Sequence, residues 1–184
     1  MSKPTIEQIS NLRDECYNIA KEHGFHDVEL PEEHWMCLVI TELSEAVEAD
    51  RKDRHADLKS FNEQVDAACY NPIEVIFEAY IKDTVEDELA DAAIRILDLA
   101  GAKKWDIGWQ FHRAEQARKN SDGEWPSFTQ IIYELFCQCI TCPLGTVLYS
   151  IFEVADYYKI DLMKHIRLKM EYNKTRNKLH GKKY

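Results

Sequence analysis

Three glutamates recur three residues apart in the segment ITELSEAVEADR, residues 40–51. On a helix, side chains at this spacing are neighbours, roughly 5 to 6 Å apart between Cβ atoms, and like charges there are mutually destabilising. Glu42 and Glu45 flank the apolar arc of this helix, whereas Glu48 points furthest from it. We therefore expect Glu42 and Glu45 to be partly buried and Glu48 to be more exposed.

A second charged strip lies in EDELADAAIRILDL, residues 86–99. Its members recur at spacings of three and four: Glu88, Asp91, Arg95 and Asp98. The strip covers about 100° of the helix surface, and the rest of the surface up to Ala100 is apolar. A helix of this kind is nearly surrounded by protein, so the strip must face other groups of the same chain or of a neighbouring subunit.

If the two strips face each other across a bundle, four carboxylates converge: Glu42, Glu45, Glu88 and Asp91. Carboxylates so close cannot all remain ionised without cations. Mg²⁺, with Mn²⁺ as a possible substitute, takes oxygen ligands and leaves positions for water and phosphate. The alternative is that each strip is an ordinary solvated helix face. A di-iron or di-manganese carboxylate bundle is excluded, because the sequence contains no Glu-x-x-His pair.

The elements that carry these residues are predicted to be helices throughout. The 184 residues include only 6 Gly and 5 Pro, which rarely interrupt the apolar periodic stretches. Capping patterns and breakers predict helices over about 5–24, 31–51, 61–82 in one or two pieces, 84–101, 103–119, 127–139, 146–158 and 161–178. They also predict a break near Asn71-Pro72 and a loop at 120–126. The fold class is therefore all-α, and we expect a single domain over residues 1–184.

The charge of the chain is unevenly distributed. Residues 161–184 contain eight Lys or Arg and two acidic residues, for a net charge of +6, whereas the other 160 residues contain 15 basic and 31 acidic groups, for a net charge of −16. An acidic body disfavours duplex nucleic acid as a partner, whereas a small phosphorylated ligand between carboxylate-bound metal and the basic end is compatible with this pattern. We find no signal peptide and no apolar run long enough to span a membrane, so we expect a soluble cytoplasmic protein.

Three segments together give the chain a resemblance to a known family. TELSEAVE and EDELADAAIRILDLAG resemble the Glu-Glu-x-x-Glu and Glu-x-x-Asp motifs of the MazG-like all-α nucleoside triphosphate pyrophosphohydrolase superfamily. The end, DLMKHIRLKMEYNKTRNKLHGKKY, is similar to the last helix and tail of a MazG-like subgroup of bacteria and phages. The three segments cover about a third of the chain.

The resemblance implies a four-helix core, assembled as a homo-oligomer (dimer or tetramer). It implies hydrolysis of a nucleoside triphosphate to the monophosphate and pyrophosphate with magnesium. Carried over by motif position, the metal ligands would be Glu42, Glu45, Glu88 and Asp91, and Glu45 would order or deprotonate a water. Thr41 stands where the family has the first Glu of its pair. Residues 51–83 and 103–158 exceed a minimal member and are expected to be insertions of additional helices.

Three residues of the last predicted helix, Lys169, Asn173 and Arg176, match the Lys-x-x-x-Asn-x-x-Arg positions of the resembling motif. Their spacing of four and three places them on one stripe. Lys and Arg would hold the β and γ phosphates, and Asn would contact sugar or phosphate. The alternative for Arg176, and for Lys178, is that cations at a helix C-terminus complement its dipole.

Other residues are candidates with strong alternatives. Trp35 lies two turns before Glu42 and could stack on a nucleobase, but a tryptophan at such a position is more often core. Arg95 could orient the carboxylate of Asp91 or form an ordinary intrahelical ion pair. His180 could close over phosphates or belong to a flexible basic end.

Six cysteines are present, three of them in CQCITC at 137–142. Because no second Cys pair or Cys/His cluster with zinc-ligand spacing follows, we interpret the cysteines as buried thiols. Two functional alternatives remain beside the pyrophosphohydrolase. One is a noncatalytic helical protein for nucleotide sensing or oligomerisation, which the Thr41 departure favours. The other is an all-α hydrolase of the dUTPase type.

Overall fold

The computed structural model describes residues 3–67, 72–118, 126–181 and 183. Within these ranges the chain forms helices and no strands, which confirms the all-α class. The helices are α1 (Ile6–Glu22), α2 (Glu32–Arg51), α3 (Leu58–Asp66), α4 (Ile73–Tyr80), α5 (Val85–Lys103), α6 (Ile107–Arg118), α7 (Phe128–Thr141), α8 (Leu144–Tyr157) and α9 (Leu162–Thr175), followed by the 3₁₀ turn η1 (Lys178–Gly181).

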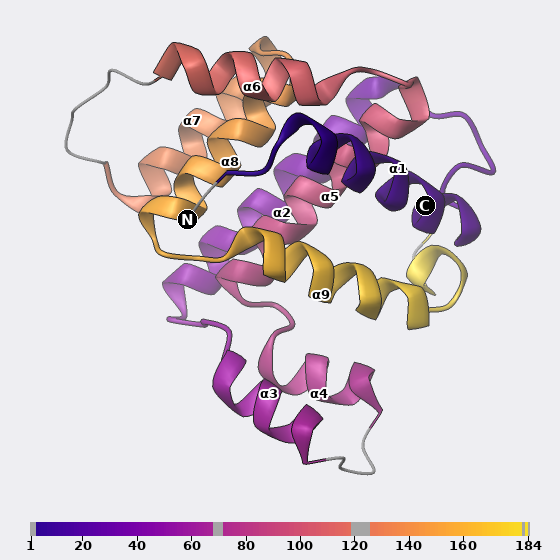
Figure 1. Cartoon of the computed structure of the whole chain (residues 1–184), viewed down its shortest axis with the longest axis vertical. Helices are drawn as coiled ribbons and strands as arrows, with labels where there is room; N and C mark the ends of the chain where they lie inside the picture. The colour runs from indigo at the N-terminus through magenta and orange to yellow at the C-terminus, as the bar shows by residue number, and fades with distance from the viewer. Residues whose placement is uncertain (1–2, 68–71, 119–125, 182, 184) are drawn as a thin grey trace.

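Helix α5 is the central element of the fold. It packs against α1, α2, α8 and α9, and α2 lies along it (Figure 1). All its apolar side chains from Val85 to Ala100, except that of Ile94, are buried. This burial agrees with the expectation that the second charged strip belongs to a helix surrounded by protein.

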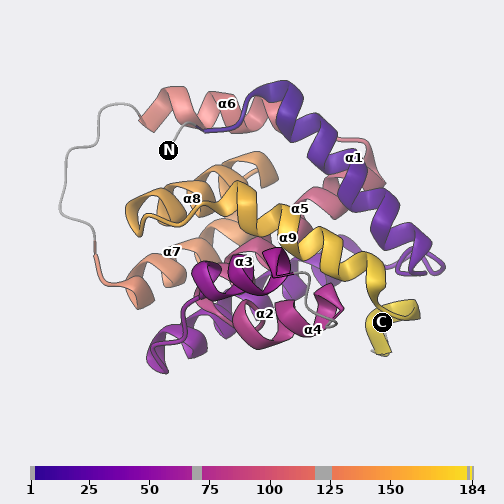
Figure 2. The same ribbon diagram turned by 60° about the horizontal axis from the view of Figure 1, so that its bottom comes forward.

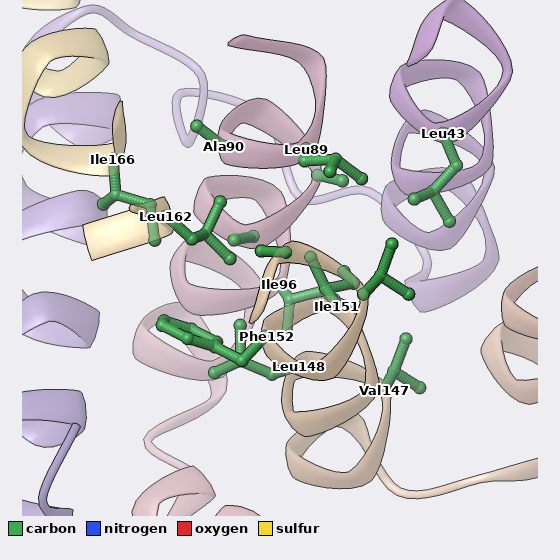
Figure 3. Close-up of a cluster of buried hydrophobic side chains, with 14 of the residues drawn as sticks. Leu43, Leu89, Ala90, Ile96, Val147, Leu148, Ile151, Phe152, Leu162 and Ile166 are labelled. Carbon is green, nitrogen blue, oxygen red and sulfur yellow. The ribbon is translucent and has the colours of Figure 1, made fainter. Parts of the chain in front are cut away.

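The main hydrophobic core forms between α5 and its neighbours. Figure 3 shows side chains of α5 and α8 gathered between the two helices, with Leu43 of α2 and Ile166 of α9 beside them. Ile96 and Leu148 are completely buried there. Helix α8 also approaches α6 closely at Gly145. A Cβ added to this glycine would lie only 2.7 Å from the carbonyl oxygen of Ile107. The core thus packs α5 against α2, α8 and α9.

Helices α3 and α4 form a hairpin beside α9 (Figure 2). They have a small hydrophobic cluster of their own, in which the ring of Phe77 stacks on Tyr172 of α9 at 4.5 Å between ring centroids. The hydroxyl of Tyr172 donates a hydrogen bond of 2.7 Å to Glu78 on α4. The hairpin, which falls in the segment predicted as an insertion, is therefore attached to the helix that carries the basic stripe.

Helix ends are close to those predicted, with local exceptions. Helix α5 extends to Lys103 because Lys104 adopts the left-handed conformation (φ 56°) that ends it. Helix α9 ends at Thr175, earlier than residue 178, because Arg176 is extended (ψ 155°). Helix α6 begins at Ile107, later than residue 103. The predicted break at Asn71, and all of the predicted loop at 120–126 except Pro126, lie outside the described residues.

No helix in the described part of the chain combines the length and the apolar composition needed to cross a bilayer.

Candidate metal centre

Three carboxylates from two helices meet at one point. Glu42 and Glu45 come from α2 and Glu88 comes from α5, and one oxygen of each lies within 4.8 Å of those of the other two. They form the one group of three or more potential metal-ligating side chains in the ranges that the structure describes. We call Glu42, Glu45 and Glu88 the carboxylate cluster. Oxygen ligands at this separation suit a hard divalent cation such as Mg²⁺ or Mn²⁺.

The three members differ in exposure. Glu42 and Glu88 are each only 4% exposed, whereas Glu45 is exposed. The expectation that Glu45 is partly buried was wrong, because at 100° per residue Glu45 falls about 40° beyond Ala49, the last buried position on that side of α2. Glu48 is exposed, as expected, and binds Arg51 and Lys52. Glu45 is thus the member that solvent reaches.

Burial makes the cluster electrostatically unfavourable without a cation. Desolvation, followed by the charges of Asp91 and Asp87, raises the pKa of Glu88 to about 9. Desolvation and the charge of Asp91 also raise the pKa of Glu42, although Arg95 opposes this effect. A divalent ion between these oxygens would favour their ionised forms and remove the conflict.

Arg95 of α5 binds the innermost carboxylate. Its Nε and Nη2 donate hydrogen bonds of 3.0 and 2.9 Å to the same oxygen, Glu42 Oε1. Both side chains are largely buried, at 17% and 6% exposed. Arg95 therefore joins α5 to α2 and fixes Glu42, rather than forming the intrahelical ion pair that the spacing allowed.

Lys169 of α9 lies between two aspartates of α5. Its Nζ is 2.8 Å from Asp87 Oδ2 and 2.8 Å from Asp91 Oδ2, and Lys169 is only 4% exposed. Burial lowers the pKa of Lys169, but the charges of Asp91 and Asp87 outweigh it and raise the pKa above its usual range. The structure therefore gives Lys169 two protein carboxylates as partners, and it leaves Asp91 out of the carboxylate cluster.

Asp98, the last member of the α5 strip, faces α1 and the loop after it. Its Oδ1 lies 2.6 Å from Nε2 of His26, and the ring of His26 stacks on Trp35 at 5.0 Å between centroids. Trp35 is 5% exposed and packs with Phe25 and Leu99. The structure thus places Trp35 in a core cluster, which was the alternative to base stacking, and it has little surface free to meet a nucleobase.

Asn173 and Arg176 line a small cavity between α1, α5 and α9, of about 50 Å³, which also contacts Asp91 and Arg95. Asn173 is 7% exposed, and its Oδ1 has no hydrogen-bond partner among the described residues. Arg176 donates to Nδ1 and to the carbonyl oxygen of His180 at 3.1 and 3.3 Å. The cavity is too small for a nucleoside unless the turn η1 moves.

A second, more open cleft reaches two members of the carboxylate cluster, Glu45 and Glu88. It has a volume of about 230 Å³ and is lined by Glu45, Glu48, Ala49, Lys52, Arg54, Asp83 and Glu88. Lys52 and Arg54 are exposed, with side-chain exposures of 56% and 47%. The cleft therefore places two exposed cations, which pair with Glu48 and Asp83, beside two members of the cluster.

Two residues of this region were missed at the sequence level. Asp87 was assigned only to the start of a helix, although it is 1% exposed and shares Lys169 with Asp91. His26, in the loop after α1, gave no periodic signal. For Asp87 a signal existed: at 100° per residue it lies about 40° from Asp91 on the helical wheel, close enough to share a cation.

The cysteine interpretation was partly wrong. Cys16 and Cys139 are buried, but Cys37 and Cys137 are exposed and Cys142 is intermediate. The sixth, Cys69, lies outside the described residues. In the described residues the cysteines take part in no group that could hold a metal.

Comparisons of the chain with protein-family models, with curated proteins and with solved structures found no match.

Proposed function

We propose that the chain is a magnesium-dependent nucleoside triphosphate pyrophosphohydrolase, which converts a ribo- or deoxyribonucleoside triphosphate to the monophosphate and pyrophosphate. The single observation that supports it most is the carboxylate cluster, whose oxygens from α2 and α5 lie within 4.8 Å of one another. The sequence motifs that resemble the MazG-like superfamily contribute the same three glutamates. Neither solvation nor a structural ion pair accounts for the convergence of all three, two of which, Glu45 and Glu88, line a cleft.

The chemistry follows from the different exposures in the cluster. A divalent ion would neutralise phosphate oxygens and stabilise the pyrophosphate leaving group. Glu42 and Glu88, both buried, are the fixed ligands in this proposal. Glu45, which faces the cleft, accepts a proton from the attacking water on a carboxylate oxygen as the water adds to the α-phosphorus and the bond to the bridging oxygen breaks.

Phosphate contacts are assigned first to Lys52 and Arg54, because both line the cleft that reaches Glu45 and Glu88. Flexible cationic side chains at such a position can follow the β and γ phosphates. Lys169 is less suited, since its ammonium already bonds to two carboxylates. Asn173 and Arg176 remain candidates for the sugar end of the substrate.

The proposal includes a homo-oligomer. Helix α7 exposes Tyr133 (67%) and Ile140 (79%), and a spacing of seven places them on one face. Apolar side chains of this size in a row on the surface favour self-association.

The test is pyrophosphate release from a panel of ribo- and deoxyribonucleoside triphosphates, with magnesium and with a chelator. We expect release only with magnesium, and we expect Glu88→Gln to lower kcat/KM at least about 100-fold, because a buried ligand is lost. The matched control is Glu63→Gln on α3, whose side chain is 64% exposed and pairs only weakly with Lys59; it should leave the rate unchanged. Folded protein that releases no pyrophosphate from any nucleotide would reject the proposal, and a rate confined to dUTP would favour the dUTPase-type alternative.

A noncatalytic nucleotide-sensing or oligomerisation protein is the second candidate. It is favoured by Thr41, which is exposed and donates its hydroxyl hydrogen bond to the carbonyl of Cys37 at 3.0 Å. The side chain of Thr41 is therefore hydrogen-bonded to the backbone of its own helix, and it supplies no carboxylate to the cluster. Nucleotide binding without turnover, unchanged in Glu42→Gln and Glu88→Gln, is the result expected for this candidate.

A further inference from the structure

We propose that the chain has a separate binding site for a small planar aromatic carboxylate, in a cleft between α6, α7 and α8. This α6–α8 cleft is lined, among others, by Trp109 and Arg113 of α6, Gln138 of α7 and Ser150 of α8. Its volume of about 910 Å³ lies within the range of about 300 to 1,000 Å³ that is typical of small-molecule sites. None of the described residues that line it also lines the cleft at the carboxylate cluster. The proposal therefore goes beyond the proposed pyrophosphohydrolase and does not depend on it.

The α6–α8 cleft forms because two helices flank α8 without closing on each other. Helices α6 and α7 both pack against α8, whereas in the described ranges they hardly contact each other. Figure 1 shows α6 lying across the top of α7 and α8. At Gly145 the backbone N–H donates a hydrogen bond of 3.1 Å to Oε1 of Gln110, which ties the start of α8 to α6. The space is thus bounded by packed helices on the side of α8.

One wall of the cleft suits an aromatic ring. The side chain of Trp109 is 54% exposed, although tryptophan is highly buried on average. Tyr149, only 4% exposed, is held edge-to-face on Phe111 at 5.4 Å between centroids, and its hydroxyl donates a hydrogen bond of 2.6 Å to Glu153. Pro143 adds further apolar surface. A planar ring placed here would remove this surface from water.

The charge of the cleft indicates the acidic group of the ligand. Arg113 is the only Lys, Arg, Asp or Glu among the described residues that line it, and in that part of the chain Arg113 forms no ion pair. Its guanidinium lies 5.2 Å from the ring centroid of Trp109, so the cation and the aromatic surface are adjacent. A carboxylate matches one guanidinium in charge and in its two-oxygen geometry, whereas a phosphate monoester carries up to two charges. We therefore assign a carboxylate rather than a nucleotide.

Polar groups of α7 and α8 favour a small molecule over a second copy of the chain. Oε1 of Gln138 has no hydrogen-bond partner among the described residues, although a buried acceptor is normally paired. Thr146 and Ser150, one turn apart on α8, both line the cleft and supply hydroxyl groups. An apolar helix face docked here would leave these groups unpaired, whereas a small ligand with its bound water can pair with them.

Isothermal titration calorimetry with 2-naphthoate and its neutral isostere 2-naphthamide, in the presence of a chelator, tests the site. We expect one naphthoate per wild-type chain, bound at least about tenfold more tightly than naphthamide, because only the acid pairs with Arg113. Arg113→Met should remove most of this difference. The matched control, Arg167→Met, alters an exposed arginine of α9 that pairs with Glu15, and should retain it. Glu88→Gln should also retain it, since Glu88 does not line the α6–α8 cleft.

Thr146→Trp, which fills the cleft, should weaken both ligands at least about tenfold, with circular dichroism at 222 nm as the check of folding. The wild-type chain alone can overturn the proposal: equal affinity for acid and amide, or no binding of either, contradicts it. Displacement of naphthoate by AMP would overturn the assignment to a carboxylate. Loss of naphthoate binding in Glu88→Gln would place the ligand at the carboxylate cluster instead. A dimer that light scattering detects and that Trp109→Ala dissociates, without naphthoate binding, would assign the cleft to a second copy.

Discussion

At the residue scale, the charges of α5 are matched one by one by side chains of other helices or loops. Arg95 binds Glu42 of α2, and Asp98 lies 2.6 Å from His26 of the loop after α1. Such pairs are buried, so their energetic effect appears mainly when one partner is removed and the other remains in a low-dielectric environment. Within the described residues, Glu88 is an acid of α5 for which no ion pair with a protein cation is found, and this is why we propose the metal at the carboxylate cluster.

Arg95→Met should lower the free energy of unfolding of the metal-free protein by about 3 to 5 kcal/mol, because buried Glu42 loses its cation. Denaturant unfolding at pH 7 with a chelator measures this loss. The comparison variant is Arg51→Met, which removes an exposed pair with Glu48 on the same helix as Glu42. Its loss should stay below about 1 kcal/mol. Equal losses in the two variants would show that the buried Arg95–Glu42 pair contributes no more to the free energy of unfolding than the exposed Arg51–Glu48 pair.

At the scale of elements, the position of the α5 strip depends on where the helix begins. The hydroxyl of Thr84 accepts a hydrogen bond from the backbone N–H of Asp87 at 3.3 Å and donates one to the carbonyl of Ile81 at 2.7 Å. Thr84 is 5% exposed, so these bonds are shielded from water. The carboxylate of Asp87 in turn accepts from the backbone N–H of Asp83 at 3.0 Å. The first turn of α5 is thus hydrogen-bonded to the residues before it through both Thr84 and Asp87.

Thr84→Ala should cost about 1 to 2 kcal/mol of stability, as expected for the loss of an N-cap with a buried partner. Chemical denaturation followed by circular dichroism at 222 nm is the measurement. Thr41→Ala is the control, because that hydroxyl is exposed on α2 and bonds only to the carbonyl of Cys37. We expect its effect to be within about 0.5 kcal/mol. A Thr84 variant as stable as the Thr41 variant would contradict the role of the cap.

At the scale of the whole molecule, the basic C-terminal end is partly neutralised by the acidic body of the same chain. Helix α9 packs against α1, α4, α5 and α8. Lys169 is buried against α5, Arg167 lies 2.7 Å from Glu15 of α1, and Lys178 lies 2.6 Å from Asp27. The uneven charge of the sequence therefore serves in part to attach α9, and less of it is left for a ligand than the sequence indicated.

The burial of α9 gives stability a pH dependence. Burial lowers the pKa of His165, which is 2% exposed, while Glu86 and Asp161 oppose this and Lys164 supports it. The unfolded chain takes up a proton below pH about 6.5 that the folded chain resists, so stability falls as pH decreases, by at most about 1.4 kcal/mol per pH unit for this group. Urea unfolding between pH 7.5 and 5 should show a smaller slope in His165→Leu than in wild type.

The exposed His112, with a side chain 45% exposed, provides the control for this measurement. His112→Gln should retain the wild-type slope, because this change removes an exposed side chain and leaves the buried His165 in place. If His165→Leu and wild type have the same slope, the buried imidazole is not the source of the acid sensitivity.

The sequence by itself determined the all-α class and the approximate bounds of most helices, and it raised the convergence of Glu42, Glu45 and Glu88, together with Asp91, as a hypothesis beside that of a solvated helix face. The helix bounds depend on local periodicity and capping, which neighbouring residues encode: Thr5, Thr84 and Asp161, which stand at the predicted starts of three helices, cap those helices. A meeting of the two acidic strips could also be suggested from the sequence. Nearly all other positions of α5 are apolar, so the strip is the part of the helix surface that can face polar groups.

Only the tertiary structure decided which acids are free to bind metal. The sequence placed Asp91 with the ligands and Lys169 with the substrate, but α9 crosses α5 so that the two side chains bind each other. It also decided that Glu45 is exposed and that Trp35 is buried. The physical reason is that the partner of a charge is set by how helices cross. That crossing depends on the packing of the whole core, and no spacing within one segment encodes it.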